Sequence, residues 1–247
     1  MSIRIRNPHS VLAALETRPK SVSEILMPPG FESGTGDTWG EVLKLAREHK
    51  VRISGRPRPQ GPVKPDDGGR LGSAEAVAEE RGGISTEELF ANARERAEGK
   101  GLWLALDSLQ DPHNVGAIFR AAAFFGVQGI MITQERSAPI TSTVYDVASG
   151  GVEYVPFTLQ TNLQRGFEVA KEAGLWILGA SEHAKDDVQS IQHDRPWLLV
   201  LGNEEKGMRR LTEESCDVLC KVGARGKVTS LNVSVAAGVL ISALTRS

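Results

Sequence analysis

Three short polar segments contain the side chains whose types and spacing could do chemistry. They run from Asp111 to Arg120, from Gly202 to Gly207 and from Ser230 to Ser234, and each follows an apolar run long enough for a strand. In α/β folds the binding and catalytic groups lie just beyond the carboxyl ends of the strands. We therefore expect the three segments to meet at one edge of a sheet and to form a site there.

The first segment combines a helix start with a basic residue. Asp111 and Pro112 favour the beginning of a helix, so Asn114 could act simply as a helix cap. Arg120 lies among apolar neighbours such as Phe119, where an unpaired guanidinium would be costly. A partner is therefore implied, either a carboxylate of the protein or the phosphate and hydroxyl groups of a substrate. The spacing leaves both open.

The second segment, Gly202-Asn203-Glu204-Glu205-Lys206-Gly207, is an acidic loop bracketed by glycines. It lacks the glycine order of dinucleotide-binding loops and the Gly-Lys-Ser/Thr of P-loops, and its carboxylates would repel a pyrophosphate. Such a loop suits a cationic ligand, or hydrogen bonds to an adenine and its ribose. A tight turn with solvated Glu205 and Lys206 is the plain structural alternative.

The third segment places Ser230 and Asn232 where an amphipathic helix should begin. Their side chains can cap that helix, or they can hold a ribose or a cofactor against its free N–H groups. The preceding stretch, residues 222–226, has two glycines and an alanine, so a flat ligand could lie against its backbone.

The elements that must position these segments read as a parallel sheet. Continuous apolar runs, rather than alternating ones, indicate strands covered on both faces. The predicted strands are 102–106, 129–132, 175–179, 197–201 and 218–222, and the predicted domain is 101–247.

Residues 1–54 predict a smaller α/β domain. A helix opened by Asn7 and Pro8, a strand over 22–27, a helix over 38–49 and a strand over 51–54 follow from the apolar spacing. Residues 55–69 are rich in Gly and Pro, so we interpret 55–100 as a linker and connecting segment; a long surface loop within one domain is the alternative. This segment also contains an extended stretch over 74–80 and a helix that Ser85 and Glu88 can cap.

Charge and composition limit the partners. The net charge is −2, but residues 1–64 hold 11 Lys and Arg against 6 Asp and Glu. A basic front domain suits RNA. The candidate phosphate contacts are Arg4, Arg6, Arg52, Arg56 and Arg58, each of which could equally belong to a solvated surface.

Metal and membrane sites are not expected. Cys216 and Cys220 have no second cysteine or histidine pair at ligand spacing, so two small buried side chains are the simpler interpretation. The N-terminus has no apolar signal segment, and the most apolar late stretch, 233–244, is too short to cross a bilayer. We expect a cytoplasmic protein.

The three segments together resemble the three motifs of the SpoU (TrmH) family of SPOUT methyltransferases. The resemblance covers about 102–246, and residues 148–151, Ala-Ser-Gly-Gly, also match a small-residue segment of the family. Residues 135–138 and 207–212 are similar to the bacterial members that 2'-O-methylate a guanosine of 23S rRNA. The N-terminal unit is similar to the ribosomal-protein-like RNA-binding domain of that group.

The resemblance implies a parallel sheet with a C-terminal trefoil knot, a homodimer, and S-adenosylmethionine as cofactor. It carries the family's cofactor contacts over to Gly202, Val222 and Leu231, with Asn203, Ala224 and Gly207 shaping the same pocket. It carries the catalytic positions over to Asn114, Arg120, Glu204, Ser230 and Asn232. Where the family usually has Ile-Pro-Met, this chain has Val222-Gly223-Ala224, which loses stiffness.

The implied activity is S-adenosylmethionine-dependent RNA ribose 2'-O-methylation, on guanosine of 23S rRNA. The same chemistry on tRNA or on another rRNA nucleotide is an alternative. A non-catalytic RNA-binding protein that retains the knot is a third reading, against which the intact Arg120, Glu204, Ser230 and Asn232 argue. A guanidinium stays protonated at ordinary pH, so we expect Arg120 to stabilise a developing oxyanion and grip a phosphate; a role as base is the alternative.

Overall fold

A seven-stranded sheet forms the centre of the larger part of the molecule. The computed structural model describes residues 1–31, 37–55, 74–96 and 98–246. The strand order is β7-β6-β5-β10-β8-β11-β9, and every neighbouring pair is parallel, which confirms the predicted sheet. The strands are β5 (Gly101–Leu106), β6 (Ile130–Thr133), β7 (Phe157–Gln160), β8 (Trp176–Ala180), β9 (Asp186–Asp187), β10 (Pro196–Leu201) and β11 (Val218–Lys221).

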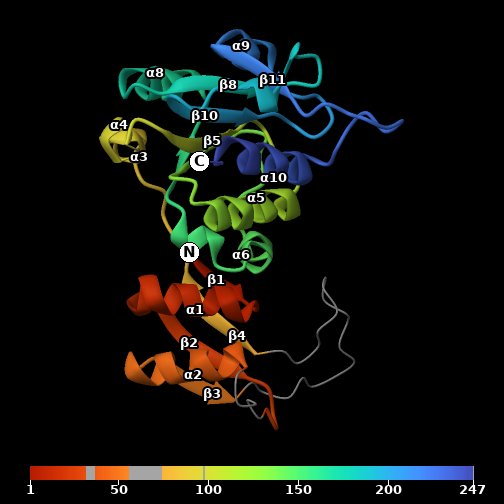
Figure 1. The fold of residues 1–247 in the computed structure, drawn as a ribbon. Coiled ribbons are helices and arrows are strands. Elements are labelled where there is room, and N and C mark those ends of the chain that lie inside the picture. Colours follow the sequence, from red (N-terminus) through yellow and green to blue (C-terminus); the bar gives the residue numbers. More distant parts are fainter. Residues whose placement is uncertain (32–36, 56–73, 97, 247) are drawn as a thin grey trace.

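Helices cover both faces of this sheet, as the continuous apolar strands require (Figure 1). Leu102, Leu104 and Leu106 of β5 pack in the cluster that contains α5 and α10, whereas Trp103 and Ala105 pack on the opposite side with α3 and α8. The helices are α3 (Thr86–Phe90), α4 (Ala93–Arg96), α5 (Pro112–Phe125), α6 (Ser142–Ala148), α7 (Gly151–Tyr154), α8 (Gln164–Glu172), α9 (Arg210–Glu214) and α10 (Val233–Leu244).

The smaller part is a four-stranded sheet with the order β1-β4-β2-β3 and helices beside it. The predicted helix at Asn7 and strand at 22–27 are confirmed, and the second helix ends at Glu48. The elements are β1 (Ser2–Ile5), α1 (Pro8–Thr17), the 3₁₀ helix η1 (Pro19–Ser21), β2 (Val22–Met27), α2 (Thr38–Glu48), β3 (Arg52–Gly55) and β4 (Glu75–Glu79).

One strand of this sheet, β1, was not expected. In β1 the buried Ile3 and Ile5 alternate with arginines, but the strand has only four residues, too few for a clear period of two. The predicted extended stretch over 74–80 is confirmed as β4, and it pairs antiparallel with both β1 and β2. The division at residues 54 and 100 stays a prediction. The Gly- and Pro-rich stretch lies outside the described residues beyond Gly55.

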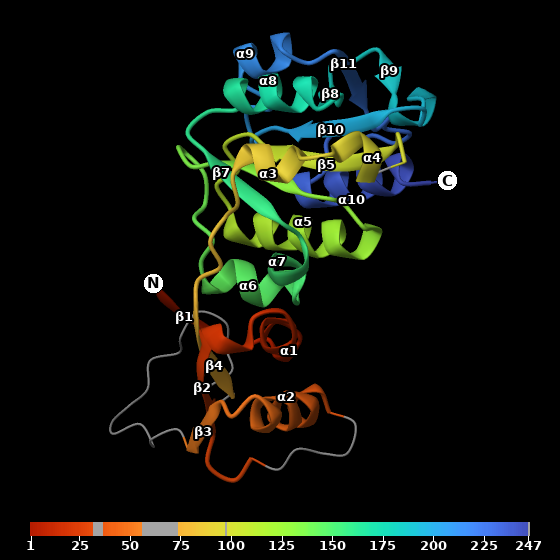
Figure 2. The ribbon, with the colours of Figure 1, turned by 90° about the vertical axis from the view of Figure 1, so that its left-hand side faces the viewer.

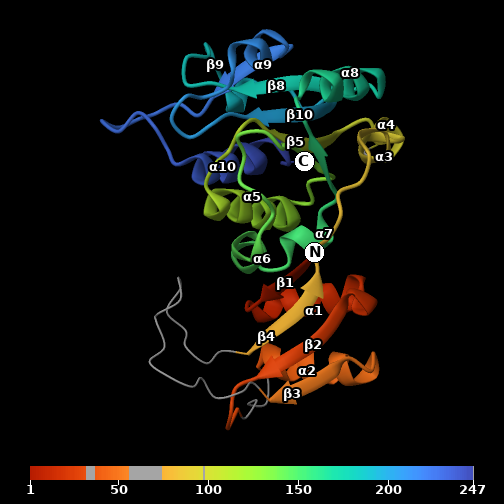
Figure 3. The ribbon, with the colours of Figure 1, turned by 180° about the vertical axis from the view of Figure 1, so that it is seen from behind.

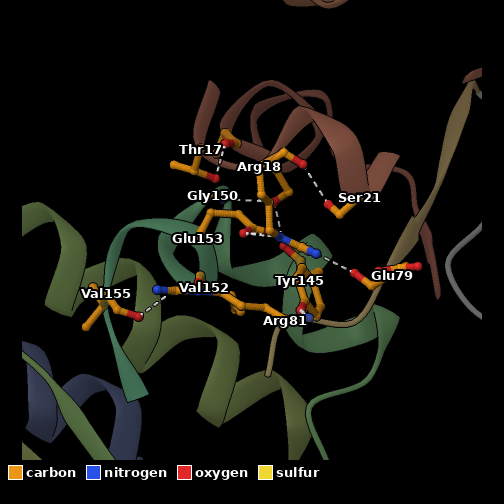
Figure 4. A network of polar contacts seen from close by, with 12 residues as sticks. Thr17, Arg18, Ser21, Glu79, Arg81, Tyr145, Gly150, Val152, Glu153 and Val155 are labelled. Atoms are coloured by element: carbon orange, nitrogen blue, oxygen red, sulfur yellow. Dashed lines mark hydrogen bonds and ion pairs between the residues drawn. The ribbon is translucent and has the colours of Figure 1, made fainter. Parts of the chain in front are cut away.

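A polar joint fastens the two parts together where α1 meets α6 and α7 (Figure 2). Nε and Nη2 of Arg18 donate to the two carboxylate oxygens of Glu153, each at 2.7 Å, and Nη1 donates to the carbonyl of Glu79 at 2.6 Å. Arg81 reaches the carbonyls of Val152 and Val155 from the other side (Figure 4). Side chains from both parts thus hold the smaller part to the larger one.

The small-residue segment 148–151 lets α1 approach this closely. The N–H of Gly150 donates to Oγ of Ser10 at 2.8 Å, and a Cβ on Gly150 would lie 3.1 Å from that of Ala13. Gly150 has a φ of 96°, a conformation that favours glycine.

Candidate active site

The turns after β5 and β10 begin side by side. Leu106 of β5 lies opposite Leu201 of β10, and the next residue, Asp107, donates its N–H to the carbonyl of Leu201 at 2.8 Å. The first two polar segments therefore leave the sheet at adjacent points of its carboxyl edge. The third leaves from β11, which is separated from β10 by β8.

The side chain of Asn114 points into the site rather than capping α5. The cap is Asp111, whose carboxylate accepts the N–H of His113 at 2.8 Å, and Pro112 is the first helical residue. The expected capping alternative for Asn114 is therefore wrong. Asn114 lies in the first turn and is only 6% exposed. Because Asp111 makes the cap, the amide of Asn114 is available for other hydrogen bonds.

Glu204 joins the first two segments. Its Oε1 accepts Nδ2 of Asn114 at 3.1 Å and lies 3.4 Å from the N–H of Asp111, while Oε2 accepts Nδ2 of Asn203 at 3.1 Å. Its loop is closed by a pair of backbone hydrogen bonds between Asn203 and Gly207. A Cβ on Gly202 would collide with the backbone of Gly207 and Met208, so a glycine is required there.

Asn232 connects the third segment to the other two. Its Oδ1 accepts the N–H of Ser234 at 2.9 Å and so caps α10, while its Nδ2 donates to Oδ1 of Asn114 at 3.0 Å. Asn232, Asn114 and Glu204 thus form a continuous hydrogen-bonded chain. Because Asn232 makes the cap, the interpretation of Ser230 as a helix cap is wrong.

Arg120 lies elsewhere on α5 and is exposed. Among the described residues it has no carboxylate or other hydrogen-bonding partner, so of the two alternatives the substrate's phosphate and hydroxyl groups stay as the prediction. Its face of α5 also bears Phe124, which is 82% exposed, so water solvates the guanidinium and no internal partner is needed. The apolar neighbours in sequence, Ile118 and Phe119, point into the core instead.

Several proposed cofactor residues lie on an exposed segment. Residues 223–231 project from the sheet edge before the chain returns to α10 (Figure 3), and Ala224, Ser230 and Leu231 are all exposed. Val222, at the end of β11, is half-buried. Within the part of the chain that the structure describes, Ser230 has no hydrogen-bond partner. The site is therefore assembled around Asn114, Glu204 and Asn232 and open on its other side.

One ion pair at the site, between a buried aspartate and a partly exposed arginine, was missed from the sequence. Asp107 is fully buried, lies 2.7 Å from Nε of Arg209, and accepts the N–H of Arg209 at 3.1 Å. This pair anchors the far end of the Gly202–Gly207 loop to the end of β5. The available signal was the acidic residue that directly follows an entirely apolar strand.

Neither cysteine contributes to the site. Burial raises the pKa of the Cys216 and Cys220 thiols to about 12, so both stay protonated at neutral pH. In the described ranges no three His, Cys, Asp or Glu side chains gather as metal ligands would. The described helices are also too short or too polar to span a membrane.

A sequence profile of the SpoU rRNA Methylase family matches residues 101–242, the range that contains the whole site. The chain belongs to this family. It is similar to the 23S rRNA (guanosine-2'-O-)-methyltransferases RlmB of Nitrosomonas europaea, 35% identical over 94% of this chain and 87% of that protein, and of Pseudomonas aeruginosa, 35% identical over 98% and 96%.

The fold is also that of solved SpoU methyltransferases. The chain is similar to AviRb of Streptomyces viridochromogenes in complex with AdoMet, with a TM-score of 0.75 and 20% identity over 99% of this chain and 89% of that one. An AdoMet-bound rRNA methyltransferase of Sinorhizobium meliloti gives a TM-score of 0.72 and 19% identity over 98% and 86%. The expected family and its α/β fold are thus confirmed.

Proposed function

We propose that this SpoU protein transfers a methyl group from S-adenosylmethionine to a ribose 2'-hydroxyl of RNA, with guanosine of 23S rRNA as the target. The observation that carries the proposal is the hydrogen-bonded chain of Asn232, Asn114 and Glu204. It joins three segments that are distant in sequence at the carboxyl edge of one sheet. Relatives named for this activity match nearly the whole chain, which supports the choice of target.

The residues around this edge fit S-adenosylmethionine. Apart from the N–H of Gly223, the backbone groups of residues 223–231 make no hydrogen bonds within the described structure, so they are available to an adenine or a carboxylate. Leu231, 52% exposed, and Val222 add apolar surface. Gly202, Asn203, Ala224 and Gly207 complete the proposed pocket. The cofactor supplies an electrophilic methyl group when bound.

The protein groups would align the ribose and stabilise charge on its oxygen. The amides of Asn114 and Asn232 are oriented by their shared hydrogen bond, and the hydroxyl of exposed Ser230 is free to contact the sugar. Arg120 has an unoccupied guanidinium in the described structure, so a phosphate and the developing oxyanion are its proposed partners. Glu204 holds Asn114 and the loop in place.

A second copy of the chain would complete the site. Phe124 on α5 and Val235 and Val239 on α10 are exposed apolar side chains on two helices that pack together. Covering such a surface is favourable, so we propose a homodimer through these helices. We also propose that the chain from β11 to α10 forms the family's trefoil knot.

RNA capture is proposed for the N-terminal part. Nη1 of Arg4 pairs with Glu75 at 2.6 Å and Nε of Arg52 pairs with Glu24 at 3.2 Å, yet both arginine side chains remain largely exposed. Arg6 also lies beside Glu75, with 3.6 Å between Nε and Oε2. Arg56 and Arg58 lie outside the described residues. We also propose a cytoplasmic location, because the proposed substrate is ribosomal RNA.

Transfer of tritium from methyl-labelled S-adenosylmethionine to purified RNA tests the function. We expect labelling of a 23S rRNA transcript, and mapping of ribose methylation should place it on one guanosine. Labelling of tRNA alone would replace the target. This alternative is included because the chain is also 38% identical, over 81% of its length, to YacO of Bacillus subtilis, named as a TrmH family tRNA/rRNA methyltransferase. A protein that binds RNA and labels none would be the non-catalytic alternative.

A further inference from the structure

Residues 223–231, which lie between β11 and the Asn232 cap of α10, are fastened at one point. All of residues 223–231 are exposed. Within the described structure, one hydrogen bond holds them: the N–H of Gly223 donates to Oδ2 of Asp187 at 3.0 Å. The proposed cofactor residues Val222 and Ala224 flank this bond. The carboxylate of Asp187 therefore controls the backbone at the start of the projecting segment.

Asp187 is itself fixed in position. It ends β9 and lies opposite Lys221 of β11 in a parallel pair. Its Oδ1 accepts the N–H of Gln189 at 3.0 Å and its carbonyl accepts Oγ of Ser190 at 2.7 Å, in the 3₁₀ helix η2 (Val188–Ser190). Each carboxylate oxygen thus has its own backbone donor, and Oδ2 is held toward Gly223.

The carboxylate also explains why residue 223 is a glycine. A Cβ at this position would lie 2.6 Å from Oδ2 of Asp187. The φ of Gly223 is not in the left-handed region, so the backbone conformation would accept another residue. Glycine is costly to order because it loses the most conformational freedom. A hydrogen bond to a charged acceptor is strong enough to offset that cost.

We propose that Asp187 is a positioning residue for the cofactor segment, because its bond to Gly223 fixes the backbone of residues 222–224. The inference rests on the proposed function, since it assumes that the cofactor lies against this backbone. A proline at this position would restrict φ through its ring and would have no N–H to donate. In this chain the carboxylate of Asp187, on β9, restricts the backbone at residue 223 through its hydrogen bond to the N–H of Gly223.

The test compares Asp187→Ala with Asp186→Ala, which removes the exposed neighbouring carboxylate of the same strand. Calorimetry would measure the Kd for S-adenosylmethionine, and hydrogen exchange of the cofactor-free protein would report the order of residues 222–231. We expect Asp187→Ala to weaken binding about tenfold and to speed the exchange of Gly223. Asp186→Ala should change neither quantity.

Two further variants exclude a simple folding defect. Asp187→Ser keeps an oxygen to cap η2 but is too short to hold Gly223, and we expect it to bind like Asp187→Ala. Adding Gly223→Pro to Asp187→Ala should restore most of the affinity, because the ring replaces the lost restriction. If Asp187→Ala showed wild-type affinity and wild-type hydrogen exchange, the inference about Asp187 would be overturned and the proposed function would stand. A wild-type protein that does not bind S-adenosylmethionine would overturn the proposed function and the inference together.

Discussion

Among single residues, Arg120 and Ser230 differ from the other proposed catalytic side chains because neither has a hydrogen-bond partner in the described structure. Asn114, Glu204 and Asn232 are held by one another. Arg120 has no such partner and therefore stabilises nothing in the fold, so we expect its loss to affect only function. Its environment could not be predicted from neighbours in sequence, because helix geometry turns Phe119 inward and Arg120 outward.

We therefore expect Arg120→Ala to reduce methyl transfer by at least about 100-fold, since one donor to a developing oxyanion is lost. The Kd for S-adenosylmethionine and the Tm should stay at their wild-type values. Arg165→Ala, which removes another exposed arginine of the larger part, is the matched control. Full transfer activity in Arg120→Ala would remove this residue from the mechanism.

Asn114 tests the hydrogen-bonded chain directly. In Asn114→Asp a carboxylate would lie about 3 Å from Glu204, so the pKa of one of the two carboxyl groups is raised and ionising both is costly. The penalty is present above that raised pKa and disappears as the pH falls below it. We expect a loss of about 1 to 2 kcal/mol in the free energy of unfolding at pH 7.

Urea unfolding of Asn114→Asp and wild type at pH 7 and at pH 4.5 measures this difference. The difference in the free energy of unfolding between the two proteins, which we call the gap, should be smaller at pH 4.5 than at pH 7, even where acid destabilises both proteins. Asn162→Asp is the control, because this exposed side chain accepts the N–H of Gln164 and makes no hydrogen bond with Glu204. A gap that does not change with pH would contradict the close approach of residues 114 and 204.

At the scale of elements, the main strands could be predicted from sequence and the short ones could not. Buried parallel strands such as β5 and β10 are long apolar runs, which the sequence displays directly. In contrast, β9 is two acidic residues whose pairing depends on β11 lying beside it. The closure of the loop after β10 also depends on contacts invisible in sequence, above all the ion pair of Asp107 with Arg209.

Gly202→Ala should disrupt that loop. The added methyl group would meet the backbone of residues 207 and 208, which cannot move aside as a flexible side chain would. We expect a stability loss of about 1 to 3 kcal/mol and a marked fall in affinity for S-adenosylmethionine. Denaturant unfolding and calorimetry measure the two effects.

Gly82→Ala is the matched control, because a methyl group there would meet nothing within 4 Å and the residue lies outside the proposed cofactor pocket. It should bind the cofactor and unfold as the wild type does. Equal behaviour of the two variants would mean that the loop after β10 is not as tightly packed as described.

For the whole molecule, the joint between its two parts was the feature least accessible from sequence. Arg18, Arg81 and Glu153 are far apart in the chain, and nothing in their spacing indicates that they meet. Glu153 is almost completely buried and depends on Arg18 for charge compensation. Removing one partner of such a pair is costly because the other charge stays buried.

Arg18→Ala should therefore lower the free energy of unfolding by about 3 kcal/mol. We also expect the wild type to unfold in one thermal transition and Arg18→Ala in two, because the smaller part of the variant detaches and melts first. Scanning calorimetry detects both effects. Lys20→Ala, on the exposed end of the same turn, should leave the transition intact. A single, unshifted transition in Arg18→Ala would show that this contact does not hold the parts together.

Because this joint fixes the four-stranded sheet of the smaller part to the seven-stranded sheet, the two sheets keep a constant orientation. If the four-stranded sheet binds RNA, the distance between the bound RNA and the methylated ribose is constant. The protein would then measure a fixed distance along the RNA. It would then choose its nucleotide by distance from a second anchoring point on a folded RNA, more than by the identity of the adjacent bases. A fragment too short to reach both points would be a poor substrate even with the correct sequence around the acceptor.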